Sequence, residues 1–508
     1  MSSAAQQPSP RPTAFSEWPR RFVARVTLQL RAPFVIRAGG EFGSGPADFV
    51  RDANGLPALP GTSLCGILRH ACLEHLGRQG HRPDTAALRT AALFGASADT
   101  EGAASRLTLS WARIHDSADR PVDGLLAPQD PRLTCPVLAE ARVGCRRQHV
   151  RINSHGTADG RGKFEESVVS AGHRFSFDLV LRGDAEDTEI WQTILDLLHD
   201  PDLRVGAGTR RGFGAFSVHR LDAACFDLRR LEDFRAFCSL PKRLDVASGL
   251  PPANATSMAN PLQVAVTLRG LRPTTPWLFG GGAPEGDESI APMTQTVIRW
   301  QNNRGAPSPP THYVPASAVK GSLAHRLAWH YNRITGQRAG NLADTPPEET
   351  ASEAVVCLFG IEASSASANV AAEAPASAGR RGLLLLDEIA LSAPAATQEI
   401  HHVSLDRFSG GARSGLLFSE RVIAPDVLRC DYRIALLVPP GTPPIAAPIR
   451  HAFAAVLEDI RKARIAFGGG SGRGNGRFRC DTVEWDDAGR WIETGEIGVT
   501  DQGAPLND

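Results

Sequence analysis

The sequence predicts an α+β protein made of two tandem ferredoxin-like (RRM-like) domains, and two observations carry this prediction. Four sequence landmarks occur twice in the same order, which indicates a duplicated domain. Within each copy, segments with strand-like alternation are interspersed with segments of helical periodicity. Strands in one layer and helices in the other form an α+β sandwich of this type.

The repeated landmarks lie 253 to 265 residues apart. They are "LPGTSLCGILRH" at 59–70 with "VPASAVKGSLAH" at 314–325, "LFG" at 93–95 and 358–360, the segments 149–172 and 402–425, and the glycine-rich loops "VGAGTRRGFGAF" at 205–216 and "FGGGSGRGNGRF" at 467–478. Because the order is kept and only the intervening lengths vary, we interpret the chain as two copies of one domain.

The domain boundaries follow from composition. We expect a disordered tail over 1–19, a first domain over 20–240, a linker over 241–260, a second domain over 261–490 and a C-terminal tail over 491–508. The linker is rich in proline, small and polar residues, which break the apolar pattern. Two stretches of the second domain are predicted to be mobile insertions, near 338–353 and 362–380.

Each copy contains the same predicted elements. Segments 21–30 and 262–270 alternate polar and apolar residues as half-buried strands do. Apolar residues at helical spacing follow Pro60 and Pro315, and segments 189–200 and 448–463 predict amphipathic helices before each glycine-rich loop. The predicted N-caps of the earlier helices are Thr62 or Ser63 in the first copy and Ser317 in the second.

Composition narrows the class of protein. The chain has 508 residues and no apolar stretch long enough to span a bilayer, so we expect a cytoplasmic protein. Its formal net charge is zero, but segments 204–220 and 461–479 are basic and contain no acidic residue, a pattern that suits a polyanion.

The nine cysteines contain no CxxC pair, and reduced thiols are expected of an intracellular chain. A structural zinc site is the less favoured alternative. Its ligands would come from Cys135, Cys145 and His149, with His155 and His173 beyond, but the spacing fits no standard zinc finger.

These ordered motifs resemble the RAMP superfamily of CRISPR-associated proteins, and within it the backbone subunits of type III effector complexes. Two such subunits look fused in tandem, as in the double-backbone subunits of some type III-D systems. The resemblance implies a subunit that binds CRISPR guide RNA, pairs it with target RNA and contacts other backbone, large and small subunits. It also implies that the long hairpin of each domain acts as a thumb that interrupts the guide–target duplex.

Three groups of residues are predicted to bind RNA. Glycine N–H groups and arginines suit a phosphate backbone, although a tight turn with solvated arginines is the alternative. These loop residues are Gly206, Gly208, Arg210, Arg211, Gly212, Gly214, Gly468, Gly469, Gly470, Gly472, Arg473 and Gly474. The helix starts offer N–H groups to phosphate, although plain capping explains the hydroxyls equally well. These residues are Thr62, Ser63, Gly66, Ser317, Lys320 and Gly321.

The hairpins form the third group, with basic residues at His149, Arg151, Lys163, His402, Arg407 and Arg413. Phe164 and Phe418 are the predicted thumb wedges, for which core packing is the alternative. The family usually has Asp-Arg where domain two has Asp406 and Arg407, whereas domain one has Asn153 and Ser154. The first hairpin therefore matches the family pattern less well than the second.

In many family members an acidic loop between the first strand and first helix cuts target RNA. The resemblance implies in-line attack by a ribose 2′-OH with a divalent metal, Mg or Mn, stabilising charge. Asp48 and Asp287 are the candidate catalytic and metal-binding residues; the backups are Asp52, Glu41, Glu285 and Glu288.

Two other functions remain open from the sequence. One is a structural RNA-binding subunit that cuts nothing, with both acidic loops merely solvated. The other is a guide-processing endoribonuclease that uses a histidine, for which His149, His155, His401 and His402 are candidates. A nucleotide-binding enzyme is poorly supported, because no GK[ST] motif occurs and neither glycine-rich loop opens a helix.

Overall fold

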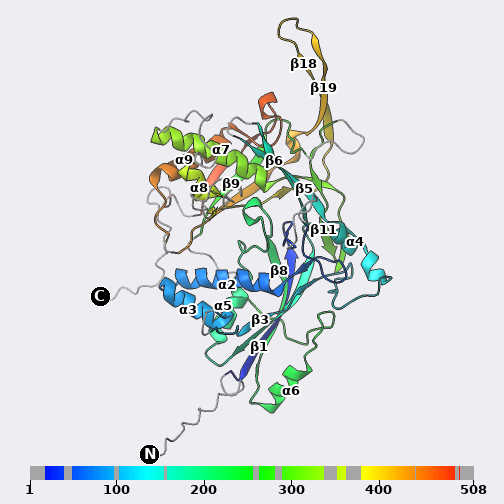
Figure 1. Ribbon diagram of the computed structural model, residues 1–508, viewed down its shortest axis with the longest axis vertical. Helices are drawn as coiled ribbons and strands as arrows, with labels where there is room; N and C mark the ends of the chain where they lie inside the picture. Colours follow the sequence, from blue (N-terminus) through cyan, green and yellow to red (C-terminus); the bar gives the residue numbers. More distant parts are fainter. Residues whose placement is uncertain are drawn as a thin grey trace, which may run out of the picture.

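The computed structural model describes residues 18–38, 48–96, 102–153, 157–255, 263–280, 289–336, 352–361, 379–440, 442–486 and 491. It consists of two α+β halves, one above the other in Figure 1, with α2 in the lower half and α7 in the upper half. The predicted mixed α+β class is confirmed.

The first domain is built on a six-stranded antiparallel sheet in the order β2-β4-β7-β1-β8, with β3 also paired to β7. The strands are β1 (Arg20–Leu30), β2 (Ala58–Leu59), β3 (Leu107–Leu109), β4 (Ala112–Ile114), β7 (Arg174–Gly183) and β8 (Phe216–Asp227). The helices are α2 (Gly61–Arg78), α3 (Pro83–Phe94), α4 (Pro136–Val143), α5 (Thr188–Leu197) and α6 (Leu231–Ser239), with short turns η1 (Pro131–Thr134) and η2 (Thr209–Arg211).

The second domain repeats this plan in the order β16-β20-β9-β22-β21, with β23 also paired to β9. The strands of this sheet are β9 (Gln263–Pro273), β16 (Leu384–Leu386), β20 (Cys430–Leu437), β21 (Ile465–Ala466), β22 (Arg477–Arg479) and β23 (Thr482–Trp485). The helices are α7 (Ala316–Thr335), α8 (Glu353–Phe359) and α9 (Ala447–Arg461), with η3 (Pro425–Val427) and η4 (Ser471–Arg473). Shorter strands are β10 (Thr294–Gln295), β11 (Ile298–Gln301), β12 (Arg304–Pro307), β13 (Thr311–Val314), β14 (Gly360–Ile361), β15 (Arg380–Arg381) and β17 (Ile389–Ala390).

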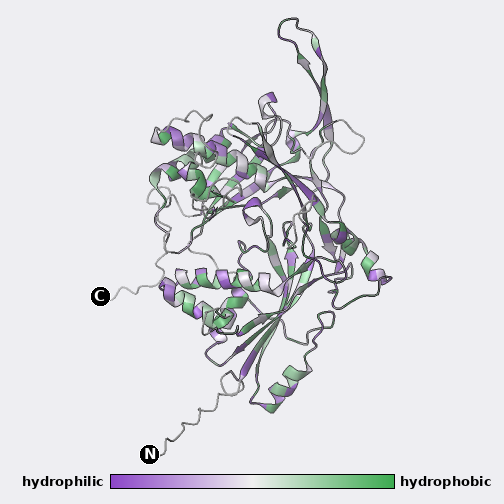
Figure 2. Cartoon of the chain, viewed as in Figure 1, coloured by the Kyte–Doolittle hydropathy of each residue, from purple (hydrophilic) through white to green (hydrophobic). Residues whose placement is uncertain are grey.

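Both sheets have the strand-helix-strand-strand-helix-strand succession that a ferredoxin-like domain requires. In the first it runs β1, α2, β4, β7, α5, β8, and the corresponding strands stand in the order β4-β7-β1-β8. The apolar face of β1 packs under α2 and α5, through Val26, Leu68 and Ile194 among others. Figure 2 shows apolar and polar residues on the same helices, as expected of helices with one buried face.

Each domain also carries a two-stranded hairpin outside its main sheet. They are β5 (Cys145–Ile152) with β6 (Ala158–Val168), and β18 (Thr397–Leu405) with β19 (Ala412–Ile423). The first hairpin runs alongside the second domain, whereas the second projects away from the body at the top of Figure 1.

The predicted N-caps were wrong. Helix α2 begins at Gly61 after Pro60, helix α7 begins at Ala316 after Pro315, and neither has a side-chain cap hydrogen bond. Each proline has a φ near the value its ring imposes and an extended ψ, which is suitable N-cap geometry. The hydroxyls of Thr62, Ser63 and Ser317 therefore fall inside the first helical turn.

Three predicted boundaries also shift. Ser352 caps α8 and Glu353 begins it, and Arg380 belongs to β15, so the predicted insertions are shorter than 338–353 and 362–380. Trp491 was assigned to the C-terminal tail but is buried in the core of the second domain against Phe453. The remaining residues of the insertions and of both tails lie outside the described residues, apart from 18, 19 and 379.

Candidate nucleic-acid interface

The two glycine-rich loops have the same backbone conformation. Gly208 and Gly212 flank η2 with φ of 71° and 91°, and Gly470 and Gly474 flank η4 with φ of 71° and 92°. These left-handed values favour glycine. The structure thus supports the duplication that the sequence predicted, because equivalent glycines in the two loops have nearly equal φ angles.

The surroundings of the two loops differ. A Cβ on Gly212 would meet Ala316 of α7, so the first loop packs against the second domain. A Cβ on Gly474 would meet no described atom within 4 Å, and η4 is exposed. The second loop therefore offers an open surface, and the first does not.

Arg210 takes part in this contact between domains. Its Nε donates to the carbonyl oxygen of Gly382 at 2.9 Å. Burial lowers the pKa of Arg210 to about 9, and the positive charges of Arg381 and Arg204 act in the same direction. Arg210, predicted to bind RNA, therefore links the two domains through its bond to Gly382.

A buried glutamate connects each hairpin to its glycine-rich loop. In domain one Glu166 is 1% exposed, and the Nη2 atom of Arg211 lies 3.0 Å from its carboxylate. His149 Nε2 lies 3.1 Å from the same carboxylate, and the His149 ring stacks on Phe164 with centroids 4.8 Å apart. Arg37 Nη2 completes the cluster at 3.4 Å from Glu166.

Domain two repeats the glutamate, arginine, histidine and phenylalanine of this cluster. Glu420 is 1% exposed and pairs with Arg473 of the second loop. His402 Nε2 lies 3.0 Å from Glu420, and the His402 ring stacks on Phe418 with centroids 4.9 Å apart. Asn475 Nδ2 donates to Glu420 at 2.9 Å.

We call each such set a hairpin–loop clamp: His149, Phe164, Glu166 and Arg211 in domain one, and His402, Phe418, Glu420 and Arg473 in domain two. Six of these eight residues were predicted to bind RNA or to act as wedges, and the structure brings them together. The two glutamates were missed. The signal was present, because each follows its phenylalanine by two positions in the repeated hairpin segment.

Burial alone would raise the pKa of both glutamates. For Glu166 the contact with His149 and the charge of Arg211 outweigh burial, so that its pKa is lowered. For Glu420 the hydrogen bond and charge of Arg473, together with His402, have the same effect. Each clamp therefore holds an ionised carboxylate at neutral pH, which neutralises part of the positive charge of its loop.

The hairpin tip of domain two carries an aromatic residue that was not predicted. Phe408 is 85% exposed, and the guanidinium carbon of Arg407 lies 4.6 Å from the centre of its ring. The predicted wedge Phe418 lies further down the hairpin, opposite His402 in register. Arg413 is exposed near the tip, and Arg151 and Lys163 are exposed on the first hairpin. Residues 154–156, which include His155, lie outside the described residues.

The helix starts contain a glycine that packing does not explain. Gly66 and Gly321 lie inside α2 and α7, where glycine costs roughly 0.5–1 kcal/mol relative to alanine. A Cβ at either position would meet no described atom within 4 Å. The absence of a side chain leaves the helix backbone open to a close approach from outside.

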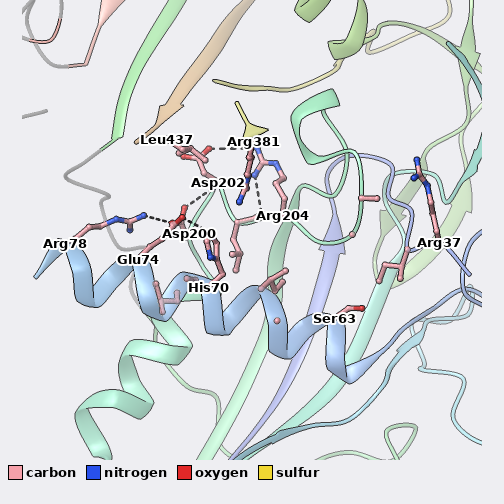
Figure 3. A pocket seen from close by; sticks show the side chains of 18 residues that line it. Arg37, Ser63, His70, Glu74, Arg78, Asp200, Asp202, Arg204, Arg381 and Leu437 are labelled. Atoms are coloured by element: carbon pink, nitrogen blue, oxygen red, sulfur yellow. Dashed lines mark hydrogen bonds and ion pairs between the residues drawn. The ribbon is translucent and has the colours of Figure 1, made fainter. Parts of the chain in front are cut away.

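A cleft of about 470 Å³ lies between the exposed face of α2 and the first glycine-rich loop (Figure 3). It brings together three residues predicted to bind RNA, Ser63, Gly66 and Gly206, and its far wall comes from Arg381 and Leu437 of the second domain. The remaining charged lining residues are Arg37, His70, Glu74, Arg78, Asp200, Asp202 and Arg204.

The charges of this cleft are partly paired with each other. His70 Nε2 and Arg78 Nη2 lie 2.9 and 3.2 Å from Glu74, one helical turn away on either side. Burial raises the pKa of Asp200. Arg37 and Arg204 are paired as well, with Glu166 and Asp387, so most of the positive charge of the cleft is balanced within the protein.

The candidate catalytic residue Asp48 is exposed but paired. Arg51 approaches both of its carboxylate oxygens at 3.2 Å, and Arg51 in turn donates to the carbonyl oxygens of Gly55 and Arg142. The backup residue Asp52 is half-buried, with its side chain 7% exposed, and accepts from the backbone N–H groups of Asn54 and Leu56, so that it stabilises the turn before β2.

The other acidic candidates, Glu41, Glu285, Asp287 and Glu288, lie outside the described residues. No group of three acidic, histidine or cysteine side chains gathers among the residues that the structure describes. A divalent metal at Asp48 would have to displace Arg51 from both carboxylate oxygens.

The two described histidines that were candidates for zinc have acidic partners. His149 belongs to the first clamp, and His173 Nε2 lies 2.6 Å from Glu140. Cys135 is the residue before α4, and burial raises the pKa of Cys145 in β5. His401, a candidate for histidine-dependent RNA processing, has its Nδ1 atom 2.7 Å from the hydroxyl of Ser419.

The fold and these clamps define the chain as a duplicated α+β protein with two basic loop-and-hairpin surfaces. A family comparison matches the RAMP superfamily over residues 27–217 and again over 271–479. The chain belongs to the RAMP superfamily, with one match in each domain. A search of curated proteins finds no match.

Membership in this superfamily indicates a CRISPR-associated RNA-binding function, and RAMP proteins typically bind CRISPR RNA and other subunits of CRISPR complexes. Of the helices in the described ranges, none is both long and apolar enough to cross a membrane.

Proposed function

We propose that this chain is a guide-RNA-binding backbone subunit of a type III CRISPR effector complex, with two backbone-type domains fused in tandem. The duplicated hairpin–loop clamp carries the proposal. Each clamp joins a hairpin to a glycine-rich loop, so the same arrangement stands twice in series along one chain, although only the second loop is open. A repeated arrangement suits a repeating polymer such as RNA better than a single small anion.

The helix glycines support the same function. A phosphate near the first turns of α2 and α7 would meet N–H groups and the positive end of the helix dipole. Gly66 and Gly321 keep that approach open at a cost in helix stability that packing does not repay. Sequence specificity would come from pairing between guide and target, so no base-reading side chain is needed.

The test of RNA binding is fluorescence anisotropy with a single-stranded RNA over a salt series. Because each phosphate contact on single-stranded RNA contributes about 0.7 to the log–log salt slope, replacing one contact should reduce that slope by about this amount. We expect this for Arg413→Ala and not for Arg235→Ala, an exposed arginine on α6. Equal slopes for the wild type and the Arg413 variant would contradict a phosphate contact at Arg413.

Cleavage of target RNA at the acidic loops is the second part of the proposal. Asp48 and Asp287 remain the candidates, with Mg or Mn as the metal. The assay counts the fragments of a labelled target RNA in Mg²⁺ and in chelator, for the wild type, Asp48→Ala and Asp287→Ala. Loss of one fragment with each variant supports cutting at both loops, and unchanged fragments exclude these residues as catalytic.

A subunit that binds RNA without cutting is the alternative that one observation favours. Arg51 occupies both oxygens of Asp48, which leaves this carboxylate less available to a metal. An intact target in Mg²⁺ with the wild-type chain would establish this alternative. Cleavage of guide RNA that persists in chelator would instead favour a histidine-dependent processing enzyme.

A further inference from the structure

A large aromatic side chain stands on the exposed face of α7. Trp329 is 47% exposed, although tryptophan side chains are mostly buried on average. In steps of four residues, Ser317, Gly321, His325, Trp329 and Arg333 follow one another along the helix and form one stripe. At a rise of 1.5 Å per residue, the ring lies about 12 Å beyond Gly321. The stripe therefore continues from the helix start that was predicted to contact phosphate.

Two arginines flank the Trp329 ring. The guanidinium carbon of Arg326 lies 4.2 Å from the ring centre, and that of Arg333 lies 5.5 Å from it. Both distances are within the range of a cation–π contact. We call Arg326, Trp329 and Arg333 the α7 platform. It places positive charge on an exposed aromatic ring.

A buried carboxylate of the neighbouring helix α9 holds the α7 platform in place (Figure 1). Asp459 is 3% exposed, and Arg326 Nε donates to it at 2.6 Å. His330 Nε2 lies 2.7 Å from the same carboxylate, and the His330 ring stands nearly perpendicular to the Trp329 ring with centroids 4.7 Å apart. Arg326 and Trp329 are therefore oriented before a ligand arrives, which reduces the entropy lost on binding. Arg333 is exposed and farther from the ring, so it can turn toward a ligand.

The charge of α7 has one sign. Its 20 residues include Lys320, Arg326 and Arg333 and no aspartate or glutamate. An aromatic ring beside cations matches single-stranded RNA, because a base stacks on the ring while phosphates contact the cations. An acidic protein would match the charge alone. The continuity of the stripe with the open backbone at Gly321 favours RNA, since a polymer of phosphates spans both places.

Domain one has a carboxylate where domain two has this ring. The helix starts at 59 and 314 are 255 residues apart, so Glu74 of α2 is the counterpart of Trp329. Glu74 is paired with His70 and Arg78 and lines the cleft between the domains. A carboxylate repels phosphate and offers no surface to a base. The α7 platform therefore has no equivalent in α2.

We propose that Trp329 stacks on a base of single-stranded RNA while Arg333 contacts a neighbouring phosphate. The inference rests on the proposed function, because it names a further RNA-binding residue, and it adds a contact to a base where the glycine-rich loop and the helix start offer contacts to phosphates. Every base has a π face, so this contact does not depend on the RNA sequence. Arg326 is a positioning residue that Asp459 holds against the ring.

The experiment compares two labelled probes by fluorescence anisotropy over a salt series. One is a single-stranded RNA, and the other is a strand of the same length with ribose phosphates but no bases. Trp329→Ala should weaken RNA binding about 5- to 150-fold, the range for one stacked base, without changing the salt slope. The same variant should bind the abasic strand as the wild type does. Arg333→Gln should instead reduce the salt slope by about 0.7 for both probes.

Two further variants serve as controls. Trp329→Phe keeps an aromatic ring and should retain most of the affinity for RNA. Trp111→Ala is the matched control, because Trp111 is 44% exposed and the guanidinium carbon of Arg113 lies 5.9 Å from its ring centre. It should change the affinity for neither probe. Unchanged binding of the abasic strand also shows that the Trp329→Ala chain is folded.

The outcomes separate this inference from the proposed function. If the wild type binds RNA and Trp329→Ala binds it equally well, the stacking contact is wrong and the face is left to a protein partner. An equal loss of affinity for RNA and for the abasic strand would also overturn the inference, because stacking requires a base. A wild-type chain that binds neither probe would overturn the proposed function and this inference together.

Discussion

Replacing Glu420 by glutamine tests whether the hairpin–loop clamp of domain two holds the hairpin in place. The carboxylate is almost fully buried and has three partners, Arg473, His402 and Asn475. Glu420→Gln keeps the size of the side chain and removes its charge. One amide oxygen then replaces two ionised oxygens, and an amide NH₂ group faces at least one donor.

The size of the effect follows from the burial of the partners. Breaking a fully buried ion pair costs about 3–5 kcal/mol. Arg473 is 41% exposed in its side chain and can regain water, so the loss should be smaller, about 1–3 kcal/mol. Since 1.4 kcal/mol is a factor of ten, the hairpin should separate from the loop roughly 5 to 150 times more often.

Amide hydrogen exchange at pH 7 measures this opening. We expect faster exchange in β18, β19 and η4 of the Glu420→Gln variant and unchanged exchange in domain one. Glu399→Gln, an exposed residue of the same hairpin, is the control. Equal exchange in the wild type and the Glu420 variant would refute the reasoning.

The pH dependence provides a second check. The folded pKa of Glu420 lies below its ordinary value of 4.5, because Arg473 and His402 outweigh burial. The stabilisation by Glu420 is therefore fully present above pH 4.5 and is lost as the pH falls through the lowered folded pKa. The difference between the wild type and Glu420→Gln should shrink on acidification in this range, as followed by thermal unfolding.

Three further predictions follow from the same contacts. Gly321→Ala should stabilise α7 by roughly 0.5–1 kcal/mol in thermal unfolding and weaken RNA binding in anisotropy, and unchanged binding would show that no phosphate approaches there. Glu388→Ala should destabilise the contact between domains by about 3–5 kcal/mol because it leaves Arg147 buried without its carboxylate, and limited proteolysis between the domains should accelerate. Adding Arg147→Met to that variant should restore most of the lost protection, whereas no recovery would place the effect elsewhere. Arg51→Ala should free Asp48 from its partner. If Asp48 binds metal, cleavage in Mg²⁺ should then persist or increase. Loss of cleavage in a variant that still folds would show that Arg51 is itself required.

The duplication is the feature that the sequence predicted best. The spacing of the helices, the strands 21–30 and 262–270 and the paired glycine-rich loops depend on local periodicity and backbone conformation, which a short segment already specifies. The predicted N-caps were wrong although they too are local features. Pro60 and Pro315 occupy the N-cap positions, and the hydroxyl residues follow inside the first helical turn.

The candidate site was only partly predictable. Side chains such as His149, Phe164 and Arg211 are recognisable as residues that bind or stack, but their common partner Glu166 reads as an ordinary strand residue. An acidic residue in a basic segment argues against RNA binding when it is seen alone. Its meaning changes once the fold places it, buried, between the hairpin and the loop.

By itself the sequence determined that there are two copies of one domain, and which residue types each copy carries at its loops and hairpins. Only the tertiary structure decided that the first glycine-rich loop is covered by the second domain while the second loop is open. The physical reason is that two identical folds in head-to-tail contact must use different surfaces. Equivalent residues such as Gly212 and Gly474 therefore have the same backbone and opposite exposure, which no local pattern encodes.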